Sequence, residues 1–365
     1  MSGCADIKRS LSRKCAAMGI PVSGIFELTP RCNLRCRMCY VRLTPEEMAP
    51  LGQEQTTRQW LELARQARDS GMVFLLLTGG EPTLRSDFCE LYEALAQMGL
   101  SISINTNGTL ITPQIRALWH KLPPAQINIT VYGTDRQDYA DLCGNPEAFD
   151  AVVDALDWLQ KEGILVHLNT TVVPTNHHKW EQLEDFAASR SLELRMTTYC
   201  FPPTRRAKGC FQRLEPEEAG ALMVKDTLYR EGPESILRKA RDLDTPLPRS
   251  CELDNGEPMQ CLAGRSQFWV TWKGEMTPCA MLTAPSVHPF RDTFDSAWNE
   301  LKQLCQPIRL CADCVECPDR KSCMNCAAVT FAETGDFAGK PEYMCRMNRA
   351  YRETLLTLAD RLRNT

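Results

Sequence analysis

The chain has 365 residues, which is enough for one large domain and a smaller one, each with its own hydrophobic core. Its net charge of −4, from 42 basic and 46 acidic residues, gives no electrostatic basis for binding nucleic acid or an anionic membrane. No apolar run could span a bilayer, and Lys8, Arg9, Arg13 and Lys14 interrupt any signal-peptide core, so we expect a cytoplasmic protein.

Six short runs of β-forming residues alternate with amphipathic helices between residues 22 and 200. The runs are rich in Val, Ile and Leu, which is typical of strands buried on both faces of a parallel sheet. Six strands joined by crossover helices predict an α/β fold, either a (β/α)6 partial TIM-like barrel or an open sheet. The predicted strands are Val22–Leu28, Val73–Thr78, Ile102–Asn105, Gln126–Tyr132, Leu165–Val173 and Glu193–Tyr199.

The crossover helices have recognisable ends and apolar stripes. One spans Thr57 to Gly71, and another begins after Asp87, which we expect to cap it with Glu90 in the capping-box position. A third carries its apolar residues on one face and ends at Gly163.

The second half of the chain has a different character. A charged helix is predicted near Glu215–Arg230, and the part from Cys251 to Cys345 holds 10 of the 19 cysteines but little helical periodicity. Metal clusters would supply the stability that apolar burial cannot provide there. The predicted organisation is an N-terminal segment (1–21), a barrel (22–205), a linker (206–250), a small cysteine-rich domain (251–346) and a C-terminal helix (347–365).

The cysteines are grouped in closely spaced pairs in a long chain that we expect to be cytoplasmic. Disulfides are rare in that compartment, so metal ligation explains the cysteines better. Because no His cluster accompanies them, iron–sulfur clusters are the preferred interpretation of these cysteines, and zinc sites are the second.

Cys32, Cys36 and Cys39 follow the first predicted strand at CxxxCxxC spacing. Three thiolates can hold three corners of a [4Fe–4S] cube and leave the fourth iron open, as a reactive cluster requires. The alternative is a zinc knuckle, which normally needs four closing ligands.

The segment from Cys32 to Tyr40 resembles the signature of the radical S-adenosylmethionine (SAM) superfamily, including the aromatic residue after the third cysteine. The resemblance implies that SAM binds the open iron through its amino and carboxylate groups. It also implies that one electron from the cluster splits the sulfonium to give a 5′-deoxyadenosyl radical, which abstracts a hydrogen atom from the substrate.

A second motif, Gly79-Gly80-Glu81, lies at the carboxyl end of the second predicted strand, where ligands gather in α/β folds. It resembles the GGEP motif of the same family, which contacts the amino group of SAM. Asn107, Thr130 and Asn169 lie at or near later strand ends, where polar residues in the family contact the ribose or carboxylate of SAM. Each of them could instead be a strand-end turn residue or a satisfied buried polar group.

The cysteines of the second half are similar to those of the SPASM domain, which holds two auxiliary [4Fe–4S] clusters. The resemblance implies that Cys261, Cys279 and Cys326 serve the first cluster. The second would be held by Cys314, Cys317, Cys323 and Cys345. Two residues, in place of the usual three, separate Cys323 from Cys326.

The first auxiliary cluster is one ligand short in this assignment. Cys251 is the candidate, Cys305 and Cys311 are rivals, and the iron could also stay open to substrate. Structural zinc sites are the alternative to both clusters. Cys200 ends the sixth predicted strand, at the rim where substrate should lie, and could act as a hydrogen-atom donor.

Enzymes with SPASM domains mainly modify ribosomally made peptides. We therefore expect a maturase that forms a crosslink, a thioether or an epimerised residue in a precursor peptide. Its partners would be that peptide and a small electron donor such as flavodoxin or ferredoxin.

Three other functions remain open. A dehydrogenase similar to sulfatase maturases would need an Asp directly after the second SPASM cysteine, and Ala280 stands there. The second is oxidation or rearrangement of a small molecule. The third is a non-enzymatic metal-binding scaffold or electron carrier, which would not bind SAM; Gly79, Gly80 and Glu81 argue against this third function.

Overall fold

The computed structural model describes residues 2–203, 211–244, 258–259 and 261–364. Within these residues, eight strands form one sheet in the order β6-β5-β4-β3-β2-β1-β7-β8, in which only the pair β7–β8 is antiparallel. The predicted mostly parallel α/β fold is confirmed. The strands are β1 Ser23–Glu27, β2 Phe74–Thr78, β3 Ser101–Thr106, β4 Gln126–Thr130, β5 Val166–Thr171, β6 Glu193–Thr197, β7 Gln267–Val270 and β8 Met276–Thr277.

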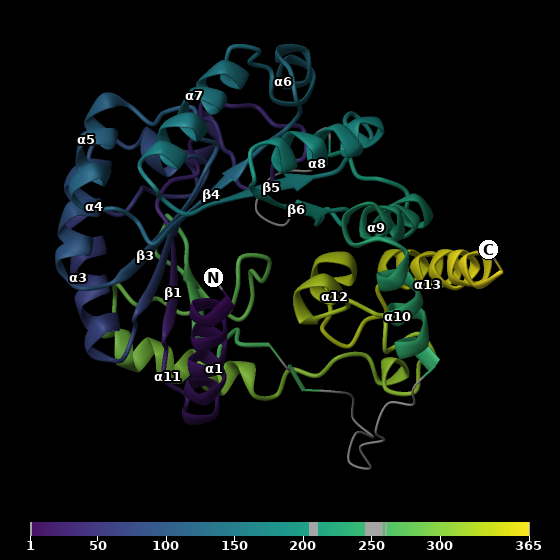
Figure 1. Ribbon diagram of the computed structural model, residues 1–365. Helices are drawn as coiled ribbons and strands as arrows, with labels where there is room; N and C mark the ends of the chain where they lie inside the picture. Colours follow the sequence, from purple (N-terminus) through teal and green to yellow (C-terminus); the bar gives the residue numbers. More distant parts are fainter. Residues whose placement is uncertain (1, 204–210, 245–257, 260, 365) are drawn as a thin grey trace.

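The crossover helices cover the outer face of the curved sheet (Figure 1). Their apolar residues, such as Trp60, Trp119 and Leu156, pack with the buried strand residues in one continuous core. These helices are α3 Thr57–Asp69, α4 Phe88–Gln97, α5 Pro113–Lys121, α6 Arg136–Cys143, α7 Ala148–Lys161 and α8 Trp180–Ser189.

The predicted capping box at the start of α4 is wrong. The side chain of Asp87 makes no capping hydrogen bond, although Asp87 occupies the cap position. Its carboxylate instead pairs with Arg85 at 2.7 Å and accepts a hydrogen bond from the hydroxyl of Thr57 on α3. A charged partner and a neighbouring hydroxyl therefore compete successfully with the helix end for this carboxylate.

The composition of the strands predicted burial on both faces. Four of the five residues of β1 are indeed buried, but the prediction is wrong for β3, β4 and β5. In β3, β4 and β5 buried and half-exposed residues alternate strictly. The buried set, including Ile104, Ile129 and Leu168, packs against the outer helices. The other set, including Asn105 and Asn128, lies on the opposite, concave face, because alternate side chains of a strand point to opposite faces.

The N-terminal segment forms the helix α1, Ser2–Met18. The ammonium group of Lys8 lies 4.7 Å from the ring centroid of Phe74, the first residue of β2. The hydroxyl of Ser266, just before β7, donates to the carbonyl of Ser12 at 3.0 Å. Helix α1 therefore lies at the amino ends of the central strands, away from their carboxyl ends.

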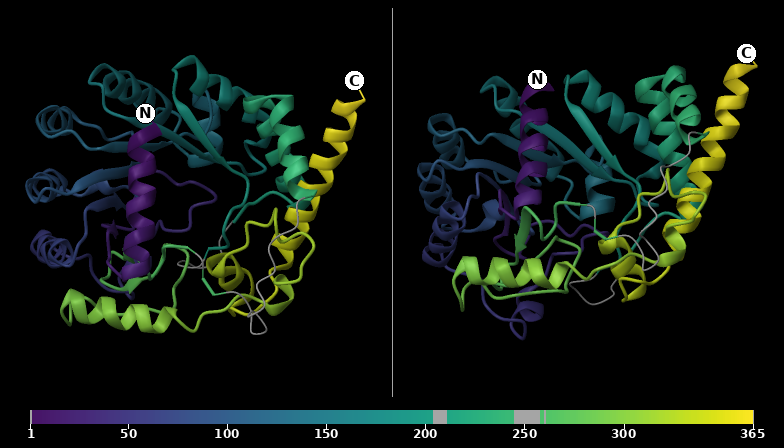
Figure 2. Two further views of the ribbon diagram at one scale, coloured as in Figure 1. Left: turned by 60° about the horizontal axis from the view of Figure 1, so that its bottom comes forward. Right: turned by 90° about the horizontal axis from the view of Figure 1, so that it is seen from below.

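The segment predicted to be a linker contains two helices, α9 Pro216–Glu231 and α10 Pro233–Asp244. Both pack on the C-terminal helix α13, Glu342–Arg363, through a small apolar core that includes Ile236 and Leu355. Figure 2 shows this helical group on the opposite side of the molecule from α3, α4 and α5. The remaining helices are α2 Pro45–Met48, α11 Phe294–Cys305, α12 Ala327–Thr334 and the 3-10 turns η1 Pro82–Leu84, η2 His177–Lys179 and η3 Ala312–Cys314.

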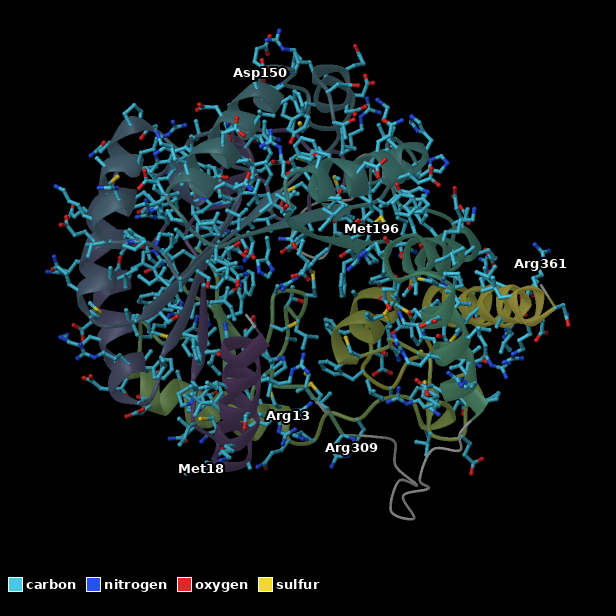
Figure 3. All side chains as sticks on the ribbon, viewed as in Figure 1. Arg13, Met18, Asp150, Met196, Arg309 and Arg361 are labelled. Atoms are coloured by element: carbon cyan, nitrogen blue, oxygen red, sulfur yellow. The ribbon has the colours of Figure 1, made fainter. Side chains whose placement is uncertain are left out.

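Strands β7 and β8 come from the cysteine-rich region yet extend the barrel sheet beside β1. At the other edge, Met196 of β6 (Figure 3) packs against a core shared with α12 and α13. The C-terminal region thus contacts both edges of the sheet. None of the helices in the described ranges is long and apolar enough to cross a membrane.

Candidate iron–sulfur and SAM site

The loop after β1 carries Cys32, Cys36 and Cys39 at the carboxyl ends of the parallel strands. Backbone amides already point at two of the sulfurs: Leu34 donates to Cys32 Sγ at 3.4 Å and Arg42 to Cys39 Sγ at 3.2 Å. Such N–H···S contacts stabilise thiolates that hold an iron–sulfur cluster. The donor set and its surroundings therefore fit a cluster with one open iron.

Glu54 fastens this loop to the barrel. Its carboxylate accepts two hydrogen bonds from the guanidinium of Arg31, at 2.7 and 2.9 Å, and one from the hydroxyl of Thr29 at 2.5 Å. Arg85 donates both to Glu54 and to the backbone carbonyl of Leu28. The start of the loop is thus held by a charged network before any cofactor binds.

Gly79 and Gly80 let β2 approach the loop closely. A Cβ atom on Gly79 would lie 2.4 Å from the carbonyl oxygen of Thr29, and one on Gly80 would lie 2.3 Å from that of Arg31. The amide of Gly80 donates to the Thr29 carbonyl at 2.7 Å. In the structure the two glycines therefore serve the contact between two protein segments.

Glu81 is fully buried. Its carboxylate accepts hydrogen bonds from the hydroxyls of Thr83 and Thr106, at 2.5 and 2.8 Å, and from the amides of Thr83 and Asn107, at 3.1 and 2.7 Å. Burial raises the pKa of Glu81, and these donors oppose that shift. Glu81 thus ties the ends of β2 and β3 together, and its predicted contact with SAM remains a prediction.

Asn107 connects the end of β3 to the cluster loop. Its side-chain amide donates to Asn33 at 2.9 Å and lies 3.6 Å from Cys32 Sγ, and its oxygen accepts from Thr109. Asn33 in turn donates to the Thr109 hydroxyl at 2.8 Å. The structure therefore places Asn107 directly at the first cysteine.

Thr130 and Asn169 are paired neighbours on β4 and β5, on the concave face near the carboxyl ends of the strands. Tyr40 is half-buried beside Cys39. These positions are compatible with the predicted binding of SAM, which stays a prediction for each of them.

Two residues near the second cysteine could not be identified from the sequence. The thiol of Cys143, at the end of α6, and the hydroxyl of Tyr132 both hydrogen-bond to Cys36. The bond with Cys143 and burial raise the pKa of Cys36 well above its usual value. Backbone amides of Arg35 and Arg37 also donate to carbonyls of α6, at 2.9 and 3.1 Å. No short-range spacing signals this contact, because α6 is far from the loop in sequence.

Cys200 lies just beyond β6 and is buried against Met38 of the cluster loop, with Leu142 and Val173 beside it. Burial raises the pKa of its thiol to about 11. The side chain is therefore a neutral S–H group at physiological pH.

A charged network joins the barrel to the C-terminal region next to Cys200. Glu333 of α12 accepts hydrogen bonds from the Tyr199 hydroxyl at 2.7 Å and from Arg213 at 2.6 Å. The guanidinium of Arg213 lies 3.8 Å from the ring centroid of Tyr343 on α13. This network fixes how α12 and α13 approach the site.

The cysteines of the second half fall into two groups in the structure. Cys279 interacts electrostatically with Cys261 and Cys326. Cys345 interacts in the same way with Cys317 and Cys323. Cys314 joins this second group.

The predicted ligand sets stay a prediction, and Cys251 lies outside the described residues. Within those residues, no three His, Cys, Asp or Glu side chains form a site for a single metal ion.

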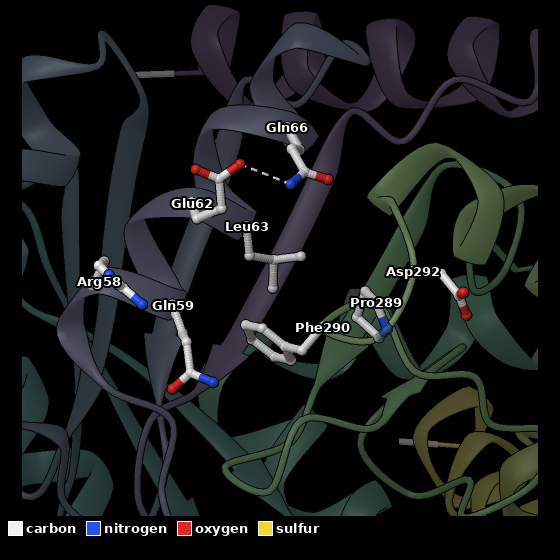
Figure 4. Close-up of a pocket in the computed structure, with 8 residues that line it drawn as sticks. All are labelled: Arg58, Gln59, Glu62, Leu63, Gln66, Pro289, Phe290 and Asp292. Carbon is white, nitrogen blue, oxygen red and sulfur yellow. Dashed lines mark hydrogen bonds between the residues drawn. The ribbon is translucent and has the colours of Figure 1, made fainter.

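A cavity of about 400 Å³ lies elsewhere, between α3 and the loop before α11 (Figure 4). Its wall includes Arg58, Glu62, Gln66 and Phe290. The Gln66 amide donates to Glu62 at 2.8 Å. None of the predicted site residues lines this cavity.

Residues 26–187, which contain the three cysteines and the glycine motif, match the family described as the Radical SAM superfamily. The protein is a radical SAM enzyme. The family implies that this radical SAM enzyme uses SAM and a [4Fe–4S] cluster, as the sequence predicts.

Known proteins resemble most of the chain. It is 25% identical over 335 residues to the AdoMet-dependent heme synthase of Methanosarcina barkeri, an alignment covering 87% of this chain and 94% of that relative.

Two solved structures share the fold of this radical SAM enzyme at 17% identity. The structure of anSMEcpe with bound AdoMet has a TM-score of 0.70, covering 94% of this chain and 95% of the other. Streptococcus suis SuiB bound to precursor peptide SuiA has a TM-score of 0.63, covering 91% and 79%.

Proposed function

We propose that this radical SAM enzyme modifies a ribosomally made precursor peptide by abstracting a hydrogen atom from one of its residues, giving a crosslink, a thioether or an epimerised residue. The polar concave face of the sheet, below the cluster loop, is the observation that carries the proposal. The fold shared with SuiB, whose structure contains a precursor peptide, supports it.

The concave face presents a row of hydrogen-bonding side chains. Asn105, Asn128, His167 and Glu193 are paired neighbours on β3 to β6. The Asn128 amide donates to Asn105 at 2.8 Å, and His167 lies 3.4 Å from the Glu193 carboxylate. Thr130, Asn169 and Arg195 form the next row toward the carboxyl ends.

Such a surface suits a peptide better than an apolar ring. Amides and carboxylates can replace the water that hydrates peptide N–H and C=O groups, so burying a peptide there leaves few polar groups unpaired. A porphyrin has large apolar faces, and cofactor pockets for such groups are mostly lined by apolar and aromatic side chains. A ring placed here would desolvate the Asn105–Asn128 row without compensating hydrogen bonds.

In this proposal Cys32, Cys36 and Cys39 hold the cluster, and Tyr40, Gly79, Gly80, Glu81, Asn107, Thr130 and Asn169 surround SAM. With both bound, the site supplies a 5′-deoxyadenosyl radical that takes a hydrogen atom from the peptide. The concave face binds the peptide below the cluster loop, and the barrel and helix α12 exclude water from it.

Where the product is an epimerised residue, Cys200 is the proposed hydrogen-atom donor; a crosslink or thioether forms with loss of two hydrogens and needs no donor. Its S–H bond breaks and a C–H bond forms on the substrate radical, leaving a thiyl radical on Cys200. One electron from a flavodoxin or ferredoxin and one proton from water restore the thiol. The auxiliary clusters, when bound, would supply a path for that electron. The high pKa keeps the hydrogen on sulfur before the reaction.

A small-molecule reaction is the second candidate, because the Methanosarcina barkeri relative, of which 94% is covered, is named an AdoMet-dependent heme synthase. The polar concave face argues against binding of a porphyrin. The two candidates differ in what the enzyme should bind and consume.

Mass spectrometry of a co-expressed peptide tests the proposal. The enzyme is expressed anaerobically in D₂O with short open reading frames that neighbour its gene, and Cys32→Ala is the control. Loss of two hydrogens indicates a crosslink, and gain of one deuterium on an unchanged skeleton indicates epimerisation. If no peptide changes and the purified enzyme instead consumes an iron porphyrin bearing propionates, the peptide proposal is wrong.

A further inference from the structure

The cysteines assigned to the first auxiliary cluster number three, and a cluster with three thiolates would keep an iron open. The loop that begins at Cys261 turns at Gly264, whose φ of +68° favours glycine. An ideal Cβ atom on Gly264 would lie 2.5 Å from the sulfur of Cys305 and 3.7 Å from Pro278, the residue before Cys279. The Cys305 sulfur therefore rests on the loop that carries one ligand, next to the turn that carries another.

Helix α11 delivers this sulfur. The helix contacts α3 and β8, buries Phe294, Trp298 and Leu301, and ends at Cys305, which is only 5% exposed. The Cys305 thiol interacts electrostatically with Cys261 and Cys279, both of the first group. A helix fixed along its length holds its last side chain in one place, as a metal ligand requires.

The other rival within the described residues belongs elsewhere. Cys311 hydrogen-bonds to Cys314, whose electrostatic neighbours are Cys345 and Cys323. The second group thus already has more thiols than one cluster needs.

We propose that Cys305 is the fourth ligand of the first auxiliary cluster, together with Cys261, Cys279 and Cys326. The proposal rests on the auxiliary clusters assumed above, and not on the identity of the substrate. Four thiolates leave every iron of the cube with a protein ligand. The first auxiliary cluster would therefore carry electrons and would not bind the substrate through an open iron.

The test counts iron and needs no substrate. In a background with Cys32, Cys36 and Cys39 all changed to Ala, only the auxiliary clusters remain. Adding Cys305→Ala should remove about four irons and about four sulfides per chain, or leave a cluster whose EPR spectrum shifts with added imidazole. The parent background should not respond to imidazole, because it has no open iron.

A variant of the rival ligand Cys251, one control and a second variant of Cys305 complete the design. Cys251→Ala and Cys15→Ala, the latter a buried thiol of α1, should leave iron content and the EPR spectrum unchanged. Cys305→Ser keeps the side-chain size. In this variant a retained second cluster and an unchanged circular dichroism spectrum verify folding. The EPR spectrum of the first cluster should still change. An unchanged spectrum in both Cys305 variants, or cluster loss in Cys251→Ala instead, overturns the proposal. Peptide modification is not measured, so these outcomes are independent of the proposed function.

Discussion

At the scale of single residues, the site is organised by side chains that do not hold the cluster themselves. Glu81 and Asn107 connect β2, β3 and the cluster loop through hydrogen bonds, and Glu54 fixes the start of that loop. Their positions are set before cofactors bind, which lowers the ordering cost of binding them. The chemistry then depends on a few groups placed beside this frame.

Cys200→Ala tests the proposed hydrogen-atom donor. Release of 5′-deoxyadenosine should stay within about twofold of the wild type, because Cys200 is not a predicted ligand of the cluster or SAM. Deuterium gain by the peptide in D₂O should fall at least about tenfold, because the substrate radical has no thiol to reduce it. Cys89→Ala, a half-buried thiol of α4, should change neither quantity. Normal deuterium gain in Cys200→Ala would remove Cys200 from the mechanism.

At the scale of elements, the contact between β2 and the cluster loop leaves no space for a side chain. Gly80→Ala would force a Cβ atom onto the Arg31 carbonyl, which is backbone and cannot move aside. We expect a destabilisation of about 2 kcal/mol and a clear loss of iron from the SAM-binding cluster. Iron analysis and the absorbance of the cluster measure this. Gly99→Ala, where no atom lies within 4 Å of an added Cβ, should strain the backbone but retain the iron.

The contact between α8 and α9 contains a titratable pair. Burial and the nearby charge of Asp226 raise the pKa of Glu184 to about 7. The folded state thus favours the neutral carboxyl, and this stabilisation is lost as the pH rises toward and through 7. Arg230, 3.9 Å from Glu184, compensates only in part.

Glu184→Gln should therefore stabilise the protein at pH 8 by about 1–2 kcal/mol and have little effect at pH 4.5. Thermal unfolding at the two pH values checks this. Glu181→Gln, exposed on the same helix, is the matched control. Equal shifts of the melting temperature at both pH values would show that folding does not raise the pKa of Glu184, and would contradict the prediction.

At the scale of the whole molecule, the barrel and the C-terminal region meet through the Glu333 network. Glu333→Gln leaves Arg213 without its carboxylate in a poorly solvated place, since the two side chains are 10% and 24% exposed. We expect a loss of about 2 kcal/mol in the free energy of unfolding, measured in urea. Glu217→Gln, which breaks a solvent-exposed pair with Arg346, should have a much smaller effect, because solvent screens that pair.

The sequence predicted the features that depend on local patterns. The CxxxCxxC spacing identified Cys32, Cys36 and Cys39, and helical periodicity identified the outer helices. The concave face was misread, because the buried Ile and Leu residues dominate strands whose other residues are polar. Asn128 and His167 stand out only when the register places them in one row.

Long-range contacts could not be predicted from one sequence. The hydrogen bond between the side chains of Cys36 and Cys143 joins two segments that share no sequence motif. Strands β7 and β8 are too short to stand out in a region rich in Pro, Gly and Cys. Their position beside β1 depends on tertiary contacts. The position of Cys305 against Gly264 is likewise visible only in three dimensions.

The pairing of β1 with β7 has a consequence for synthesis on the ribosome. β1 ends at Glu27, and its partner on one side, β7, begins only at Gln267. For most of translation one edge of β1 has no strand to bond, although β2 is already available on its other side. An open parallel edge is a site for mispairing with another chain. Nascent chains arrested before Gln267 should therefore be cleaved more readily by a protease than chains arrested after β8, and equal cleavage would contradict this order of assembly.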